Sequence, residues 1–222
     1  MILKVIDNFL TETYHKAILE TMTSGTFEWY YGDSITGSLG IKNSDATNIF
    51  NGYGFSHIYW HEKGDPGGPD YPGPVGPYAR FIQPMLFQIL DVVRSNPSPD
   101  NYNFIWRSRA DMVTWTGKDE FIHAPHVDIN FPNIASILYV NESDGDTVFY
   151  NTKEEDITHY SELTEHERVS PKPNRLVMFR GDLLHTGCSP TKHANRILIN
   201  SNFVHKEYID EMCNKHGGVI TD

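Results

Sequence analysis

The second half of the chain is a series of short strand-like segments, and this pattern limits the folds open to it. From about residue 102, runs rich in β-branched and aromatic residues alternate with turn signals such as ESDGD and PKPN. The runs are YNFIWRSR, DMVTW, IASILYVN, DTVFYN, RLVMFR and RILINSNFV. No strand–helix–strand alternation accompanies them, although a parallel sheet would need it. The pattern therefore predicts an antiparallel sandwich or small barrel.

The first half is organised differently. A short strand is expected in LKVIDNFL, and apolar residues at helical spacing predict helices over residues 11–25 and 78–95. Between them, residues 28–78 are rich in Gly, Tyr and Pro and have no clean period, which favours an ordered loop that could serve as a lid. With 222 residues, we expect one domain. Residues 1–100 would support and cover it, 101–205 would form its β core, and 206–222 its tail.

Charge and composition limit the partners. The chain has 29 acidic and 18 basic residues, a net charge of −11, which disfavours nucleic acid and anionic membranes as partners. Neither a signal-peptide core nor an apolar run of membrane-spanning length is found, and two cysteines make no disulfide framework. These features predict a cytoplasmic protein.

The segment FIHAPHVDIN carries three candidate metal ligands. His126 and Asp128 are two residues apart, so on a strand both side chains face the same way, whereas His123 would face the other way. We therefore expect His126 and Asp128 to bind and His123 to be a solvated loop residue. An HxD pair alone is a weak signal, and a surface turn hydrogen bond is the alternative.

A second segment completes the set. His185 follows an apolar strand 57 residues after Asp128, and Arg196 comes eleven residues later. Two histidines and one carboxylate fill one face of a metal ion and leave positions open, as in non-haem Fe(II) oxygenases. A planar guanidinium suits the distal carboxylate of a bound 2-oxo acid. Catalytic zinc in a hydrolase and a cupin-like binding module without activity are the alternatives.

The ordered motifs resemble the Fe(II)/2-oxoglutarate-dependent dioxygenases, and within them the prolyl 4-hydroxylase-like branch that includes small phage proteins. The resemblance covers about residues 104–204, from HVD through GDTVFYN and RLVMFRGDLLH to RILINSNF. It implies a double-stranded β-helix, or jelly roll, that is mainly β with flanking helices. For a phage protein, the expected location is the host-cell cytoplasm.

The resemblance also assigns roles. It implies Fe(II) on His126, Asp128 and His185, with 2-oxoglutarate and O2 as cosubstrates and ascorbate as a supporting reductant. Residues expected to bind the cosubstrate are Arg196, Tyr139, Asn200 and Trp115, the last standing where many relatives have a tyrosine.

The implied reaction is hydroxylation of a C–H bond with release of succinate and CO2. A prolyl residue in a peptide is the first candidate substrate, and a free amino acid or other small metabolite is the alternative. Arg107 and Arg109 share one face of their segment, so either could meet a substrate carboxylate; solvated arginines on an exposed strand are the alternative.

Overall fold

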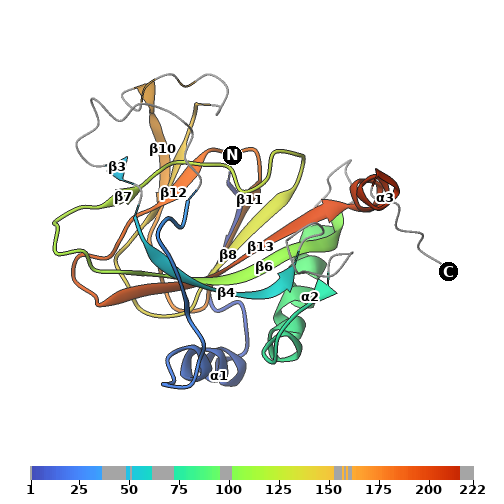
Figure 1. Cartoon of the computed structure of the whole chain (residues 1–222), viewed down its shortest axis with the longest axis horizontal. Coiled ribbons are helices and arrows are strands. Elements are labelled where there is room, and N and C mark those ends of the chain that lie inside the picture. Colours follow the sequence, from blue (N-terminus) through green and yellow to red (C-terminus); the bar gives the residue numbers. More distant parts are fainter. Residues whose placement is uncertain are drawn as a thin grey trace.

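The computed structural model of the chain describes residues 2–36, 49–50, 52–61, 73–95, 102–152, 157, 159 and 162–215 (Figure 1). The helices are α1 (Glu12–Met22), α2 (Ala79–Ser95) and α3 (Lys206–Lys215). The strands are β1 (Ile2–Ile6), β2 (Tyr30–Gly32), β3 (Ile49–Phe50), β4 (Gly54–His61), β5 (Gly73–Pro74), β6 (Tyr102–Thr114), β7 (Ile122–His123), β8 (Ile134–Tyr139), β9 (Thr147–Tyr150), β10 (Glu165–Val169), β11 (Arg175–Arg180), β12 (His185–Gly187) and β13 (Asn195–His205). Within these residues, no helix is long and apolar enough to cross a membrane.

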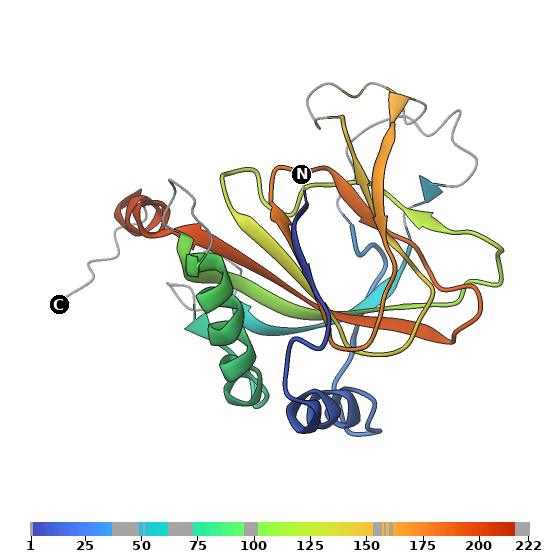
Figure 2. The same cartoon turned by 180° about the vertical axis from the view of Figure 1, so that it is seen from behind.

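Two antiparallel sheets form the body of the molecule. The larger sheet has the strand order β1-β11-β8-β13-β6-β4-β2, with β5 paired to β4, and the smaller has the order β10-β9-β12. Figures 1 and 2 show the smaller sheet rising from one end of the larger one. The two sheets share a buried apolar cluster, in which Phe149 of β9 and Val169 of β10 meet Ile137, Val177 and Leu198 of the larger sheet. The expected jelly roll, mainly β with flanking helices, is confirmed.

The larger sheet separates this interior from a helical layer. Along β8, Ile137 and Tyr139 join the cluster between the sheets, whereas Leu138 joins a second cluster with residues of α1 and α2, such as Ile18 and Ile89. This is the period-two alternation of a strand that is buried on both faces. The predicted helices therefore cover the outer face of the larger sheet, below the sheet in Figure 1.

The segment over residues 28–78 contributes more regular structure than its sequence predicted. Its strand β4 pairs antiparallel with β6, and β2 extends the sheet beyond β4. The strand escaped prediction because Ser56 and His57 interrupt the apolar alternation, and His57 is nevertheless 4% exposed. The other parts of the proposed lid, residues 37–48 and 62–72, lie outside the described residues.

The chain's first strand is held to the larger sheet by an ion-pair cluster. Asp7 accepts hydrogen bonds from Arg175 Nε at 2.6 Å and Lys172 Nζ at 2.9 Å. These two hydrogen bonds hold the pKa of the Asp7 carboxyl well below its usual range. The pair ties the end of β1 to the start of β11, its hydrogen-bonded neighbour.

We expect Asp7→Asn to lower the free energy of unfolding by about 1 kcal/mol at neutral pH, the size typical of partly exposed ion pairs. Because the folded-state pKa is depressed, the stabilisation is present above the unfolded pKa of about 4 and is lost as pH falls below it. Urea unfolding of both proteins at neutral and acidic pH measures this. A difference that stays constant with pH would contradict the charged role of Asp7.

Candidate active site

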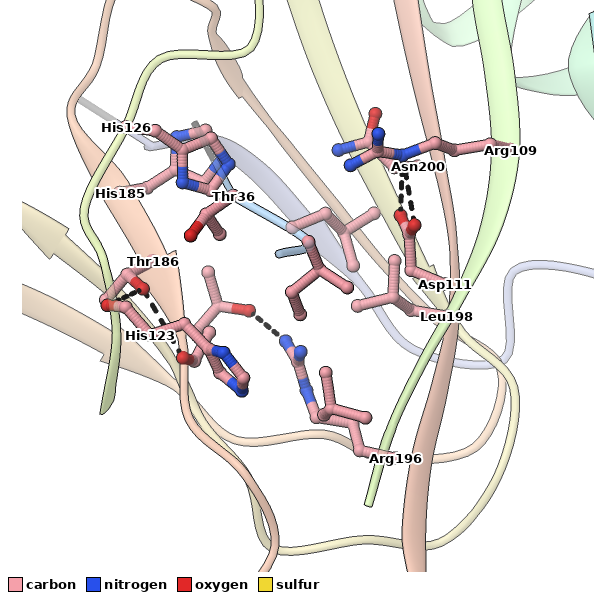
Figure 3. Close-up of a pocket in the computed structure, with 15 residues that line it drawn as sticks. Thr36, Arg109, Asp111, His123, His126, His185, Thr186, Arg196, Leu198 and Asn200 are labelled. Carbon is pink, nitrogen blue, oxygen red and sulfur yellow. Dashed lines mark hydrogen bonds and ion pairs between the residues drawn. The ribbon is translucent and has the colours of Figure 1, made fainter. Parts of the chain in front are cut away.

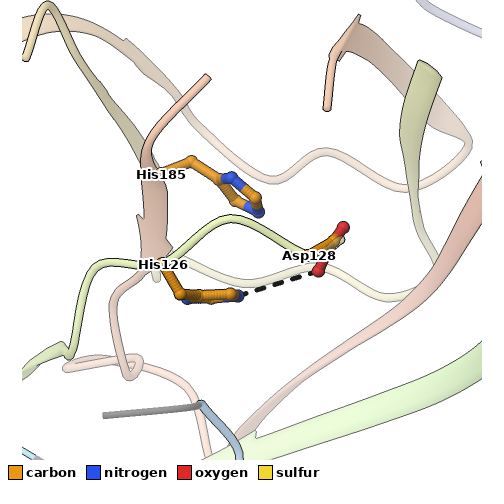
Figure 4. Close-up of side chains that lie close together, drawn as sticks. All are labelled: His126, Asp128 and His185. Atoms are coloured by element: carbon orange, nitrogen blue, oxygen red, sulfur yellow. Dashed lines mark ion pairs between the residues drawn. The ribbon is translucent and has the colours of Figure 1, made fainter. Parts of the chain in front are cut away.

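His126, Asp128 and His185 lie together at the junction of the two sheets. The backbones of His126 and His185 form an isolated antiparallel bridge, with N–H to O distances of 2.9 and 3.0 Å. This bridge brings the two imidazole rings to a centroid distance of 4.8 Å, and Asp128 follows two residues later. One potential ligand atom from each of the three residues lies within 4.8 Å of the others (Figure 4).

Hydrogen bonds to backbone carbonyl groups determine which nitrogen of each imidazole carries a proton. His126 Nδ1 lies 3.1 Å from the Ala124 carbonyl oxygen, and His185 Nδ1 lies 2.9 Å from that of Leu183. A carbonyl oxygen only accepts, so each Nδ1 carries the proton and each Nε2 keeps its lone pair. Burial, together with the charge of His185, lowers the pKa of His126 to about 4, which keeps this ring neutral.

Asp128 is held as a carboxylate by donors on two strands. Its Oδ2 accepts from Asn200 Nδ2 at 3.0 Å and Asn202 Nδ2 at 3.1 Å, while Oδ1 lies 3.3 Å from Arg107 Nη2. Burial alone would raise the pKa of Asp128, but Arg107 and the two histidines hold it well below its usual range. Nε2 of His126, Nε2 of His185 and one carboxylate oxygen of Asp128 therefore form a donor set that fits Fe(II).

We expect Asn202→Leu to weaken metal binding by roughly 10–100-fold, the range found when hydrogen-bond partners of metal ligands are removed. Asn202 is fully buried, and leucine keeps its approximate volume while removing the donor to Asp128 Oδ2. Calorimetric titration with Mn(II) measures the affinity, with Asn103→Leu at the start of β6 as the control. Equal affinities in the two variants would show that Asp128 needs no such support.

A cavity extends from this cluster between the sheets (Figure 3). Its walls include Arg109, Asp111 and Val113 of β6, and Arg196 and Asn200 of β13. These residues alternate along their strands, so their side chains point to the same side of the larger sheet. The predicted ligands His126 and His185 line the same cavity.

Arg196 lies in the cavity wall with donors available. It is 4% exposed, and its Nη2 donates to Thr147 Oγ1 at 2.6 Å. Its Nε is buried without a hydrogen-bond acceptor among the described residues. A Cβ on Gly187 would lie 2.7 Å from Arg196 Nη1, so the close approach of the guanidinium requires glycine there. An anionic ligand in the cavity would satisfy the remaining donors.

Tyr139 does not lie in the cavity wall, where the sequence interpretation placed its hydroxyl. That hydroxyl is 2.7 Å from Thr147 Oγ1 and donates to the Val169 carbonyl oxygen at 3.2 Å. The ring lies 5.4 Å from the Arg196 guanidinium carbon. Thr147 lines the cavity instead, so Tyr139 orients Thr147 and Arg196 from behind. Thr147, which opens β9, carries no sequence signal beyond its place in GDTVFYN.

The structure places Trp115, which was predicted to bind the cosubstrate, away from the cavity. Trp115 is 55% exposed and does not line the cavity. Trp115 follows Thr114, the last residue of β6, and its backbone N–H still donates to the Ala194 carbonyl oxygen at 3.0 Å. Asn200 does line the cavity, but its amide is directed to Asp128 rather than to a free position.

His123 is also not the solvated residue that was expected. It is 1% exposed, lines the cavity, and its Nε2 lies 3.0 Å from Ser189 Oγ. Burial, reinforced by the charge of Arg196, lowers the pKa of His123 to about 3, so the ring is neutral. Strand alternation failed here because β7 ends at His123, before His126 pairs with His185.

Comparison with known families agrees with this geometry. Residues 112–204 match the family model described as the 2OG-Fe(II) oxygenase superfamily. The matched residues include His126, Asp128, His185 and Arg196, and the match supports a 2-oxoglutarate-dependent dioxygenase. The matched family implies Fe(II), 2-oxoglutarate and O2 as cofactor and cosubstrates.

Solved structures share the fold of this chain at low sequence identity. A 2OG-Fe(II) oxygenase family oxidoreductase from Burkholderia pseudomallei is 10% identical, with a TM-score of 0.56 over 87% of this chain and 78% of that one. A Trichoplax adhaerens prolyl hydroxylase, in complex with a hypoxia inducible factor peptide fragment, is 16% identical, with a TM-score of 0.54 over 94% and 86%. The α-ketoglutarate-dependent epimerase SnoN of nogalamycin biosynthesis is 9% identical, with a TM-score of 0.55 over 90% and 76%. No match is found among curated protein sequences.

Proposed function

We propose that the protein hydroxylates a C–H bond of an organic substrate and converts 2-oxoglutarate and O2 into succinate and CO2. The observation that carries the proposal is one cavity lined by His126, His185 and the buried Arg196, with Asp128 beside the two histidines. A zinc hydrolase would need a general base but no such arginine. A binding module without activity would need no intact set of three ligands.

Each residue has a distinct task in this proposal. His126 and His185 would hold Fe(II) through Nε2 and Asp128 through a carboxylate oxygen. Bound Fe(II) would supply the activation of O2 and the oxidative decarboxylation of 2-oxoglutarate. Arg196 would hold the C5 carboxylate of 2-oxoglutarate, and Thr147 and Tyr139 would keep its guanidinium in place.

Apolar side chains and a neutral histidine complete the cosubstrate position. Val113, Ile137 and Leu198 line the cavity between Arg196 and the metal cluster. They exclude water from the carbon chain of 2-oxoglutarate, which strengthens the ionic contacts at its ends. His123 fills the wall beside Arg196 without adding charge.

A prolyl residue in a peptide is the first candidate substrate. The sequence motifs resemble prolyl 4-hydroxylases, and the Trichoplax adhaerens prolyl hydroxylase, which shares the fold, is in complex with a peptide fragment. Exposed aromatic rings offer a surface suited to proline: Tyr31 and Tyr53 are 66% and 44% exposed, and their centroids lie 6.0 Å apart. A free amino acid is the second candidate, favoured by the arginines near the metal cluster.

The test begins without a substrate. Purified protein is mixed with Fe(II) and 2-oxoglutarate under anaerobic conditions, and we expect a weak visible charge-transfer band. Air is then admitted and succinate is measured with and without prolyl peptides and free amino acids. A protein that gives neither the band nor succinate under any of these conditions is not the proposed oxygenase.

A further inference from the structure

A second pair of guanidinium groups lies beside the metal cluster. Arg107 and Arg109 occupy alternate positions of β6 and are 15% and 25% exposed. Arg109 lines the cavity, where Figure 3 shows it beside Asn200, and its Nε donates to Asp111 Oδ2 at 3.0 Å. Arg107 Nη2 lies 3.3 Å from Asp128 Oδ1. We refer to Arg107 and Arg109 together as the β6 arginine pair.

The β6 arginine pair and Arg196 stand at opposite ends of the site. Arg109 pairs with Asn200, whereas Val113 pairs with Arg196, four residues further along both strands. At about 3.4 Å per residue, these backbone positions are roughly 14 Å apart. The Arg196 guanidinium also turns away from β6 toward Thr147 and Gly187 of the smaller sheet. 2-Oxoglutarate, a five-carbon diacid, would bind Arg196, and the β6 arginine pair would therefore remain available for another ligand.

The charges around the cavity point to the nature of that ligand. Among the described residues of the site, three arginines, Arg107, Arg109 and Arg196, accompany two carboxylates, Asp111 and Asp128, which leaves one positive charge in excess within that set. Fe(II) would add two positive charges and 2-oxoglutarate two negative ones, so the excess remains once both are bound. The whole chain has a net charge of −11, so its composition does not explain a positively charged cavity. Uncompensated charge away from water is costly, and an anionic partner relieves it.

Arg107 has donors that the protein does not satisfy. Its Nε and Nη2 are buried without a hydrogen-bond acceptor in the described structure. The 3.3 Å contact with Asp128 is an ion pair, and the same oxygen, Asp128 Oδ1, lies 3.8 Å from His126 Nε2. A metal ion on that oxygen would compete with Arg107 for its electron density. The Arg107 guanidinium could then form hydrogen bonds with an anionic group of a ligand that enters the site.

We propose that the substrate presents a carboxylate to the β6 arginine pair and so brings its reacting C–H bond to the metal. This rests on the proposed oxygenase function and names the chemical class of its substrate. The carboxylate could be that of a free amino acid, the C-terminus of a peptide, or an acidic side chain within a peptide. Free proline or a peptide that ends in proline would combine this requirement with the prolyl candidate.

The test measures binding with turnover blocked. The protein is loaded with Mn(II) and 2-oxoglutarate, and ligands are titrated by calorimetry. The ligands are the twenty amino acids and a set of proline-ending peptides, each as free acid and primary amide, together with end-blocked prolyl peptides with and without an internal aspartate. We expect the acids that bind to do so at least about tenfold more tightly than their amides.

Variants of Arg109 test whether the arginines cause the preference for acids over amides. Arg109→Gln is expected to bring the acid-to-amide ratio close to one, and Arg109→Lys to keep part of it, because lysine retains the charge but not the planar fork. Arg109→Lys also preserves a partner for Asp111, so it guards against a folding defect. Arg180→Gln, at an exposed pair with Asp182, is the control and keeps the wild-type ratio.

The outcomes separate this inference from the proposed function. The inference is overturned if amides and acids bind equally, if no carboxylate of the panel binds, or if Arg109→Gln keeps the wild-type ratio. Preference for free amino acids, for free peptide C-termini or for internal aspartate identifies the source of the carboxylate. Succinate formed from 2-oxoglutarate without any carboxylate preference would leave the oxygenase intact and remove only the substrate class. A preference for carboxylates without succinate formation would support the substrate class and contradict the oxygenase function.

Discussion

Asp128→Ala and His185→Ala are each expected to lower metal affinity by more than about 100-fold and to abolish succinate formation. Loss of a direct ligand should exceed the 10–100-fold effect of losing a hydrogen-bond partner of a ligand. The three potential ligand atoms already lie within 4.8 Å of one another, so each residue would provide one of the three ligands found among the described residues. Mn(II) titration and anaerobic Fe(II) loading measure the first effect, and succinate release measures the second.

The two variants should differ in stability although both lose the metal. Asp128→Ala leaves Arg107 without the carboxylate that compensates its charge, at a cost of about 3–5 kcal/mol for breaking a buried pair. His185→Ala breaks no ion pair among the described residues, so its apo form should unfold at a higher denaturant concentration than that of Asp128→Ala. His185→Ala therefore keeps the test valid if Asp128→Ala does not fold. Wild-type metal affinity in folded His185→Ala would exclude the proposed centre.

Arg196→Ala is expected to raise the KM for 2-oxoglutarate by at least about 100-fold. Charge-assisted hydrogen bonds contribute about 1.5–3 kcal/mol each, and a guanidinium that meets a carboxylate in fork geometry makes two. Arg196→Lys should recover part of the affinity, because the charge remains while the paired geometry is lost. Initial-rate kinetics and titration of the charge-transfer band with 2-oxoglutarate measure the change.

Two companion variants locate the effect of Arg196. Thr147→Val keeps the side-chain shape but removes the hydroxyl that accepts from Arg196 Nη2, so a smaller rise in the same KM is expected. Metal affinity without 2-oxoglutarate should stay at the wild-type value in Arg196→Lys, because Arg196 contacts none of the three ligands. An unchanged KM in Arg196→Ala would mean that 2-oxoglutarate binds elsewhere. Arg180→Ala, on the exposed surface, controls for loss of charge alone.

Much of the fold could be predicted from local sequence patterns. Runs of apolar and β-branched residues located β8, β11 and β13, because strands that pack on both faces are rich in such residues. Helical spacing located α1 and α2 to within a few residues. Strand β4 was missed because its polar residues are buried by tertiary contacts, which periodicity does not register.

The candidate site divides in the same way. His126, Asp128, His185 and Arg196 could be named from motif order, and the structure brings them around one cavity. The positions of Trp115, His123 and Tyr139 differ from those expected, and the three differences share one cause. The position of each side chain depends on where its strand ends or on which distant strand it faces. Neither the strand end nor the facing strand can be predicted from the few residues around that position.

The amino-acid sequence by itself determined the β-rich class, the two helices and the types of side chain that a non-haem iron centre needs, because these follow from spacing along the chain. Only the tertiary structure decided which polar groups meet. Thr147 and Arg196 are 49 residues apart, and Asn202 and Asp128 are 74 apart, yet each pair is hydrogen-bonded. Such contacts arise from cross-strand register, and a shift of one residue would turn each side chain to the opposite face of its sheet.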